Sequence, residues 1–128
     1  MEGCIAVAAI SARVMVESLS AGGARAIALD LFGDRDTRAS AEAWHGIGDP
    51  ARLAFDDEAF MDAIAQLARR GDVAGWVAGS GFEARPDLLA RGASVLPLLG
   101  NTAELVHRIR TPAWFYPWLA TQAVPHAE

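Results

Sequence analysis

The sequence predicts an α/β fold: a Rossmann-like three-layer α/β/α sandwich with a mainly parallel sheet of four to five strands. Residues 5–10 form a continuous apolar run, which is typical of a strand covered on both faces. A helical pattern then leads through short joints to a second apolar run at residues 26–32. Strand–helix–strand order of this kind indicates a right-handed parallel crossover.

A third apolar run, at residues 73–78, ends abruptly in Gly79-Ser80-Gly81, and Pro86 is suited to the first turn of a following helix. This pattern predicts a strand that turns into a helix through a glycine loop. In open α/β sheets, ligands bind in the crevice at the carboxyl ends of the strands. We therefore expect the binding site of this protein beside the Gly-Ser-Gly corner.

Local signals justify the other elements. Ser11 is placed to cap the first helix, and Gly22-Gly23 is placed to end it. We next expect a polar loop at 30–38, a brief helix at 37–43, a short strand at 44–47 and a helix at 57–70 with acidic residues first and arginines last. A helix at 86–91 and an edge strand at 94–99, which Pro97 interrupts, should follow. Asn101 and Glu104 are spaced as a capping box that opens a helix with Leu105, Val106 and Ile109 inward, and a helical turn from Thr111 would be kinked by Pro117.

Composition limits the function classes. With 128 residues and no linker or repeat, the chain is expected to be one domain, residues 1–128. A net charge of −5 argues against nucleic-acid binding, and the apolar runs are too short to cross a membrane. All eleven basic residues are arginines, so neither a lysine Schiff base nor a phosphate-binding lysine can form within this chain. The three histidines lack metal-ligand spacing, so no metal site is expected, and the single cysteine, Cys4, fits the cytoplasm.

The glycine corner carries the candidate site. Glycines let backbone amides approach a ligand, and an arginine offers a planar fork for a carboxylate or phosphate. The residues expected to bind substrate are Ser11, Arg13, Ser80, Gly81, Glu83 and Arg85. The alternative is that the glycines only make a tight turn, that Glu83 pairs with Arg85, and that Ser11 is a plain helix cap.

The other groups of polar and titratable residues are better explained by structural roles than by catalysis or cofactor binding. Asp30 ends the second strand where dinucleotide-binding folds place a ribose-binding acid, but the preceding turn lacks the required glycines, so NAD or FAD binding is disfavoured. The charged residues from Asp30 to Arg38 are more typical of a self-paired polar loop. No catalytic set containing histidine can be assembled, and Cys4 is expected to be buried and inert.

Four aromatic residues lie between positions 114 and 118. They either belong to the core or form a patch that a partner covers, and a charge-poor run of this kind favours the partner. A homo-oligomer through Trp114, Phe115 and Trp118 is therefore one expectation.

Four stretches resemble the N-terminal segment of ATP-grasp ligases, in particular the predicted carboligases of methylotrophs and methanogens. They are Ser11-Ala-Arg, Ala28-Leu-Asp-Leu-Phe-Gly-Asp-Arg-Asp-Thr-Arg, Gly79-Ser-Gly-Phe-Glu-Ala-Arg-Pro and Leu99-Gly-Asn-Thr-Ala-Glu. The resemblance covers nearly the whole chain, except that the aromatic run replaces an expected leucine-rich helix. It implies a pre-ATP-grasp domain whose loops contribute to the acceptor-substrate pocket, with ATP and Mg²⁺ bound by later domains rather than by this chain.

The resemblance implies an ATP-dependent carboxylate–amine ligase, linked to tetrahydromethanopterin or methanofuran biosynthesis, in which this chain supplies the substrate side and is not catalytic alone. Its partners would be a small-molecule acceptor and an ATP-grasp domain in cis or in trans. Two other classes remain open: a stand-alone Rossmann-like interaction module that docks through its aromatic end, and a small nucleotide-binding protein.

Overall fold

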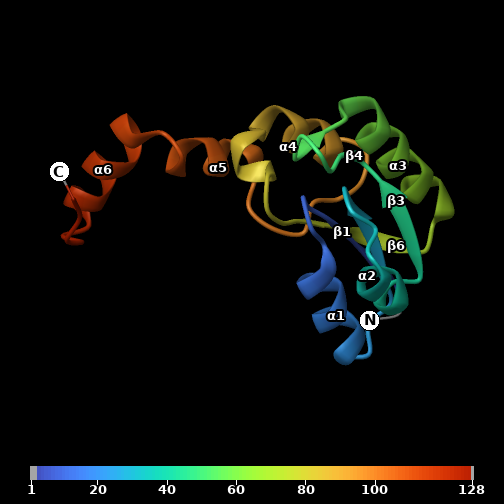
Figure 1. Ribbon diagram of the computed structural model, residues 1–128. Helices are drawn as coiled ribbons and strands as arrows, with labels where there is room; N and C mark the ends of the chain where they lie inside the picture. Colours follow the sequence, from blue (N-terminus) through green and yellow to red (C-terminus); the bar gives the residue numbers. More distant parts are fainter. Residues whose placement is uncertain (1–2, 128) are drawn as a thin grey trace.

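The computed structural model describes residues 3–127. Figure 1 shows a sheet with helices on both faces and a C-terminal pair of helices that extends to one side. The elements are, in order, β1 (Cys4–Ala8), α1 (Arg13–Ala21), β2 (Ala26–Asp30), α2 (Arg35–Ser40), β3 (Ala43–Gly46), β4 (Gly48–Asp49), β5 (Ala54–Phe55), α3 (Asp57–Arg70), β6 (Val73–Ala78), the 3₁₀ turn η1 (Phe82–Ala84), α4 (Pro86–Ala93), α5 (Ala103–Ile109) and α6 (Pro112–Thr121).

The main sheet is parallel, with the strand order β3-β2-β1-β6. The chain builds β1, β2 and β3 in one direction and then crosses back through α3 to place β6 on the other side of β1. This is the α/β sandwich with a parallel sheet that the sequence predicts. The expected fifth strand is reduced to a single parallel bridge between Trp76 and Leu98.

Two apolar layers hold the helices on the sheet. On one face α1 packs through Val16 against Val7 and Ala28, with α2 beside it. On the other face α3 and α4 cover a cluster in which Phe60, Trp76 and Phe82 meet edge to face or tilted, with ring centroids 5.2 to 5.4 Å apart. The Trp76 indole N–H is buried, and it donates to the Leu96 carbonyl oxygen at 3.1 Å.

Asp30, at the end of β2, is completely buried, and its carboxylate accepts hydrogen bonds from four N–H groups. Oδ2 accepts from the Ala12 amide at 3.0 Å, and Oδ1 accepts from the amides of Phe32 and Gly33 and from the Trp44 indole. The carboxylate therefore ties the start of α1, the loop after β2 and the strand β3 together. It does not form the self-paired polar loop that the sequence suggested.

Asp30 also explains why the predicted cap of α1 is wrong. The N-cap residue is Ala12, which makes no side-chain cap, and the buried carboxylate binds the Ala12 amide instead, leaving Ser11 exposed. At α5 the cap is Thr102, which accepts from the Leu105 amide at 3.2 Å, rather than Asn101. At α1 a carboxylate from a distant segment binds the first amide, and at α5 the residue after Asn101 provides the cap.

The strand expected at 94–99 forms only at Leu98. Residues 94–96 continue the turn of α4, because the amides of Ser94, Val95 and Leu96 donate to carbonyl oxygens in the last turn of that helix. The hairpin of β4 and β5 was not predicted, and it connects β3 to α3. The helix expected at 57–70 is confirmed with the same bounds.

The end of the chain is the least buried part. α6 contains Pro117 within a continuous helix, and neither α5 nor α6 has a buried residue. Leu105 and Ile109, expected to face inward, are 39% and 43% exposed. No helix within residues 3–127 combines the length and the apolar character that a membrane span requires.

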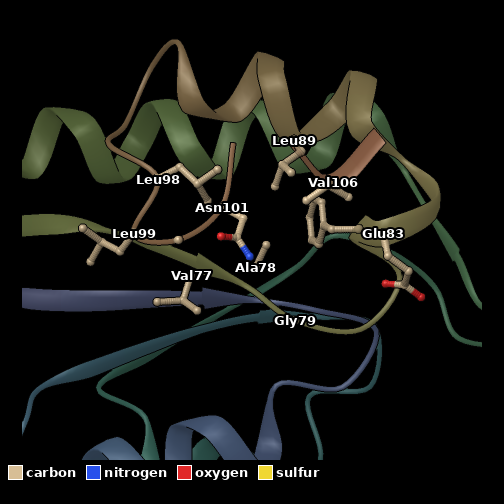
Figure 2. Close-up of a pocket in the computed structure, with 11 residues that line it drawn as sticks. Val77, Ala78, Gly79, Glu83, Leu89, Leu98, Leu99, Asn101 and Val106 are labelled. Atoms are coloured by element: carbon tan, nitrogen blue, oxygen red, sulfur yellow. The ribbon is translucent and has the colours of Figure 1, made fainter. Parts of the chain in front are cut away.

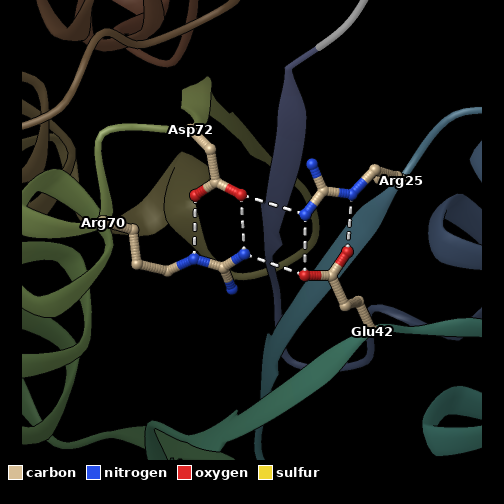
Figure 3. A network of polar contacts seen from close by, with 4 residues as sticks. All are labelled: Arg25, Glu42, Arg70 and Asp72. Atoms are coloured by element: carbon tan, nitrogen blue, oxygen red, sulfur yellow. Dashed lines mark hydrogen bonds and ion pairs between the residues drawn. The ribbon is translucent and has the colours of Figure 1, made fainter.

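An ion-pair network joins the amino-terminal edge of the sheet to the end of α3 (Figure 3). Arg25 and Arg70 both contact Glu42 and Asp72, with N–O distances of 2.8 to 2.9 Å. The hydrogen bonds from the two guanidinium groups lower the pKa of Glu42 and of Asp72 to about 2, and the carboxylates raise the pKa of both arginines in return.

Substitution of Asp30 by asparagine is expected to destabilise the fold. The amide nitrogen would face an N–H donor at one of the two oxygen positions, and a buried donor without an acceptor costs about 1–3 kcal/mol in the free energy of unfolding. Urea unfolding of Asp30→Asn measures this loss. The exposed substitution Asp62→Asn is the control, and equal unfolding midpoints for the two variants would contradict the role of Asp30.

The network also predicts a pH dependence of stability. Because the pKa values of Glu42 and Asp72 are lowered in the folded state to about 2, their contribution is complete above about pH 4.5 and is lost as the pH falls toward 2. The double variant Glu42→Gln/Asp72→Asn should show a shallower decline of the urea midpoint over this window than the wild type. Glu58→Gln/Asp62→Asn serves as the matched control, and an identical slope in both double variants would refute the prediction.

Candidate functional site

A cavity of about 250 Å³ opens at the carboxyl end of β6, on the side away from β1 (Figure 2). Its walls come from the end of β6, from η1, from α4, from the segment after the Leu98 bridge and from α5. The lining residues are Val77, Ala78, Gly79, Phe82, Glu83, Leu89, Leu98, Leu99, Gly100, Asn101 and Val106.

The unfinished fifth strand creates this cavity. The segment at 97–99 pairs with Trp76 through two hydrogen bonds, from the Trp76 amide to Pro97 and from the Leu99 amide to Trp76. The chain then leaves the sheet edge to reach α5, so the space beside the last residue of β6 is not filled by a strand. Leu89 and Val106 close the cavity from the helical side.

Two polar side chains line the cavity. Glu83 is the one ionisable residue of the lining, and its Oε2 accepts from the Gly81 amide at 2.7 Å, which fixes the carboxylate at the rim. Asn101 also lines the cavity, from the exposed segment after Leu99, and its amide is the second polar side chain (Figure 2). An adjoining groove shares Glu83 and contains His107 and Arg110.

The glycine corner is packed against the exit of β1. The Ile10 amide donates to the Ser80 carbonyl oxygen at 2.8 Å, and a Cβ at Gly79 would lie 2.8 Å from Ala9. Gly81 has φ +98°, and a Cβ there would meet Ile10 and Phe55 at under 3 Å. The packing of the chain on itself therefore requires both glycines.

The predicted arginines lie outside the cavity. Arg85 donates to both carboxylate oxygens of Asp57 at 2.9 and 3.0 Å and also to Asp87, and it does not pair with Glu83. These carboxylates raise the pKa of Arg85, with Asp87 the larger influence. On the other face of the sheet, Arg13 pairs with Glu17 and Asp36.

Of the six residues predicted to bind substrate, Glu83 lies in the cavity wall, and the Gly81 amide donates a hydrogen bond to its carboxylate. Ser80 and Ser11 are exposed near the β1–β6 junction, and the two arginines are held in ion pairs. Residues 98–101 form a cavity wall that was not assigned to the site. The signal was present, because Leu99-Gly-Asn belongs to one of the stretches that carry the family resemblance.

Within residues 3–127 no group of histidine, cysteine and acidic residues is arranged to hold a metal ion. Cys4 is buried, and desolvation raises the pKa of its thiol, which disfavours the reactive thiolate. A larger hollow of about 490 Å³ lies under the β4–β5 hairpin, with Arg52, Asp49 and Asp56 among its lining residues. It shares no lining residue with the cavity at β6, although its residue Phe55 packs on Phe82 of that cavity with ring centroids 4.5 Å apart.

No known protein family matches the sequence, and no curated protein matches it either. Solved structures do match the fold. The biotin carboxylase subunit of pyruvate carboxylase superimposes on 98% of this chain with a TM-score of 0.70 and 14% identity. An L-amino acid ligase from Bacillus licheniformis covers 96% with a TM-score of 0.66 and 18% identity.

A third similar structure is N5-carboxyaminoimidazole synthetase from Staphylococcus aureus in complex with ADP, with a TM-score of 0.64 and 14% identity over 94% of this chain. This chain spans only 28%, 31% and 30% of the three matched chains. Its fold is therefore that of one part of these larger enzymes.

Proposed function

We propose that this chain is the substrate-side, N-terminal domain of an ATP-dependent carboxylate–amine ligase of the ATP-grasp type. One observation carries the proposal: nearly the whole chain superimposes on less than a third of a biotin carboxylase, an amino acid ligase and a carboxyaminoimidazole synthetase. The sequence resemblance to ATP-grasp ligases points in the same direction independently of the fold.

The cavity beside β6 is the acceptor site in this proposal. Glu83 orients the acceptor through the carboxylate that the Gly81 amide holds in place. Ser11 and Ser80 are exposed and do not line the cavity, so they would contact only a ligand that extends beyond it. Arg85 acts through its ion pair with Asp57, which attaches the start of α4 to the start of α3 and so positions η1. Arg13 would reach an acceptor only by leaving Glu17 and Asp36.

The residues of the cavity do not fit a nucleoside triphosphate. The lining has one carboxylate and no cation, and the glycine corner is occupied by the packing of the chain itself. In ATP-grasp ligases, ATP with Mg²⁺ activates a carboxylate as an acyl phosphate, which an amine captures. This chain would bind and orient the acceptor, and it would not turn over alone.

The finer assignment, to a ligase of tetrahydromethanopterin- or methanofuran-linked one-carbon metabolism, rests on the sequence resemblance, and the cytoplasmic location rests on the single cysteine. The ATP-binding part would then be joined to this domain in cis or supplied in trans.

A second candidate function is that of an interaction module. It is favoured by α5 and α6, which have no buried residue and extend away from the sheet (Figure 1). Trp118 is 43% exposed and stacks on Trp114 at 5.8 Å, and residues 111–125 carry no charged side chain. A helix that is apolar on all sides is normally covered, here by a second copy or by another protein.

The first function predicts that Mg²⁺ with ATP leaves the melting temperature of the chain unchanged. A ligand at a hundred times its dissociation constant stabilises a protein by about 2.7 kcal/mol, so binding would be visible in a thermal shift assay. We also expect the reading frame beyond residue 128, or an adjacent gene, to encode an ATP-grasp domain. Stabilisation by ATP alone would contradict the proposal and favour a small nucleotide-binding protein.

The second function predicts a stable dimer that dissociates in Trp118→Ala. Size-exclusion chromatography at several concentrations measures this, with Val14→Ala as the control because Val14 is a highly exposed apolar residue on α1. A wild-type chain that elutes as a monomer at every concentration would exclude self-association through α6.

A further inference from the structure

The last residue of β6 presents an unpaired backbone edge to the cavity. The Gly79 amide donates to the Ala8 carbonyl oxygen, so the backbone N–H and C=O groups of the alternate residues Val77 and Gly79 point toward β1. The backbone groups of Trp76 point the opposite way, because they bond to Pro97 and Leu99. By the two-residue period of a strand, the N–H and C=O of Ala78 also face that way, into the cavity.

No backbone partner satisfies Ala78 there within residues 3–127, because the pairing ends after the Trp76–Leu98 bridge. Ala78 is half-buried and lines the cavity. An unpaired strand edge of this kind is a template for hydrogen bonding. The side-chain amide of Asn101, which lines the same cavity, adds a second donor and acceptor (Figure 2).

Apolar side chains surround these polar groups. Val77, Leu89, Leu98 and Val106 surround the Ala78 edge. At about 250 Å³ the cavity is slightly smaller than the roughly 300–1,000 Å³ of most ligand pockets, which suits one ring with a small substituent.

The geometry points to a neutral, planar ligand that carries an adjacent hydrogen-bond acceptor and donor on one edge, as in an amide, a lactam or an amino-heterocycle. Its acceptor takes the Ala78 N–H, its donor reaches the Ala78 C=O, and its ring packs between Leu98 and Val106. Calling this ligand the acceptor substrate rests on the proposed function, whereas binding at Ala78 does not require it.

Charge refines the choice of ligand. A carboxylate can accept from Ala78 N–H but has no donor for the C=O, and Glu83 at the rim repels it. An ammonium ion is attracted by Glu83 and can donate to the C=O, but it leaves the Ala78 N–H without an acceptor. A neutral amide satisfies both groups.

Three probes of nearly equal size test this: benzamide, benzylamine and benzoate. Each is titrated into the full ¹⁵N-labelled chain while the backbone amide signals are followed by NMR. We expect benzamide to shift the Ala78 amide signal downfield in a saturable manner, and we expect benzoate to leave it unchanged. Benzylamine should shift signals around Glu83 more than that of Ala78.

Asn101→Ala is the test variant, with Gln66→Ala as the control because Gln66 is an exposed amide on α3, away from the cavity. The second N–H of the benzamide amide group would donate to the Asn101 side-chain oxygen. Losing this one hydrogen bond should weaken benzamide binding about three- to tenfold in Asn101→Ala and leave binding to the control unchanged.

Benzoate binding as tightly as benzamide, or a benzamide titration that leaves Ala78 unaffected, would overturn the inference. The two proposals can be refuted separately. If ATP stabilises the chain, the ligase-domain proposal is wrong even when benzamide shifts the Ala78 amide signal. If benzamide leaves that signal unchanged, this ligand class is wrong whatever the ATP assay shows.

Discussion

The buried carboxylate of Asp30 is the constraint on which the arrangement of the sheet and the first helix depends. An uncompensated charge inside a protein is strongly unfavourable, and this one is stable because four N–H groups surround it. Those donors come from three different segments, so the carboxylate fixes the start of α1, the loop after β2 and the position of Trp44 together. A glycine is required at position 33 for Trp44 to reach Asp30, because a Cβ there would lie 2.5 Å from the Trp44 ring. The position that binds a ribose in dinucleotide folds has a structural role in this protein.

On the opposite side of β1, close packing decides where the cavity lies. A Cβ at Gly92 would meet Trp76 and Phe60 at under 3 Å, so α4 lies directly on the aromatic cluster under β6. The Trp76 indole binds Leu96 and its backbone binds Pro97 and Leu99, which hold the following segment at the sheet edge for one bridge only. Trp76 therefore anchors the wall of the cavity, and the chain leaves the sheet edge after this bridge.

Several arginines outside the cavity are held in ion pairs, whereas the cavity itself has no cationic side chain. Arg25, Arg70 and Arg85 are each held by two carboxylates, and Arg13 is held by Glu17 and Asp36. Most of these pairs are exposed and contribute little each to stability, but they occupy the guanidinium groups that an anionic ligand would need. The cavity keeps apolar walls, an amide and a single carboxylate, which favours a neutral ligand over a phosphate or a carboxylate.

The sequence alone determined the parallel α/β architecture, the bounds of α3 and the glycine corner after β6, because apolar runs, helix-terminal charges and glycines act locally. It also indicated Glu83 and, in the Leu99-Gly-Asn stretch, residues that line the cavity. Only the tertiary structure decided that Asp30 binds the Ala12 amide at the start of α1 while Ser11 makes no cap, that Arg85 binds Asp57 rather than Glu83, and that the strand expected at 94–99 shrinks to one bridge. In each case the partner lies far away along the chain or competes with a nearer one, and only packing in three dimensions determines which contact forms.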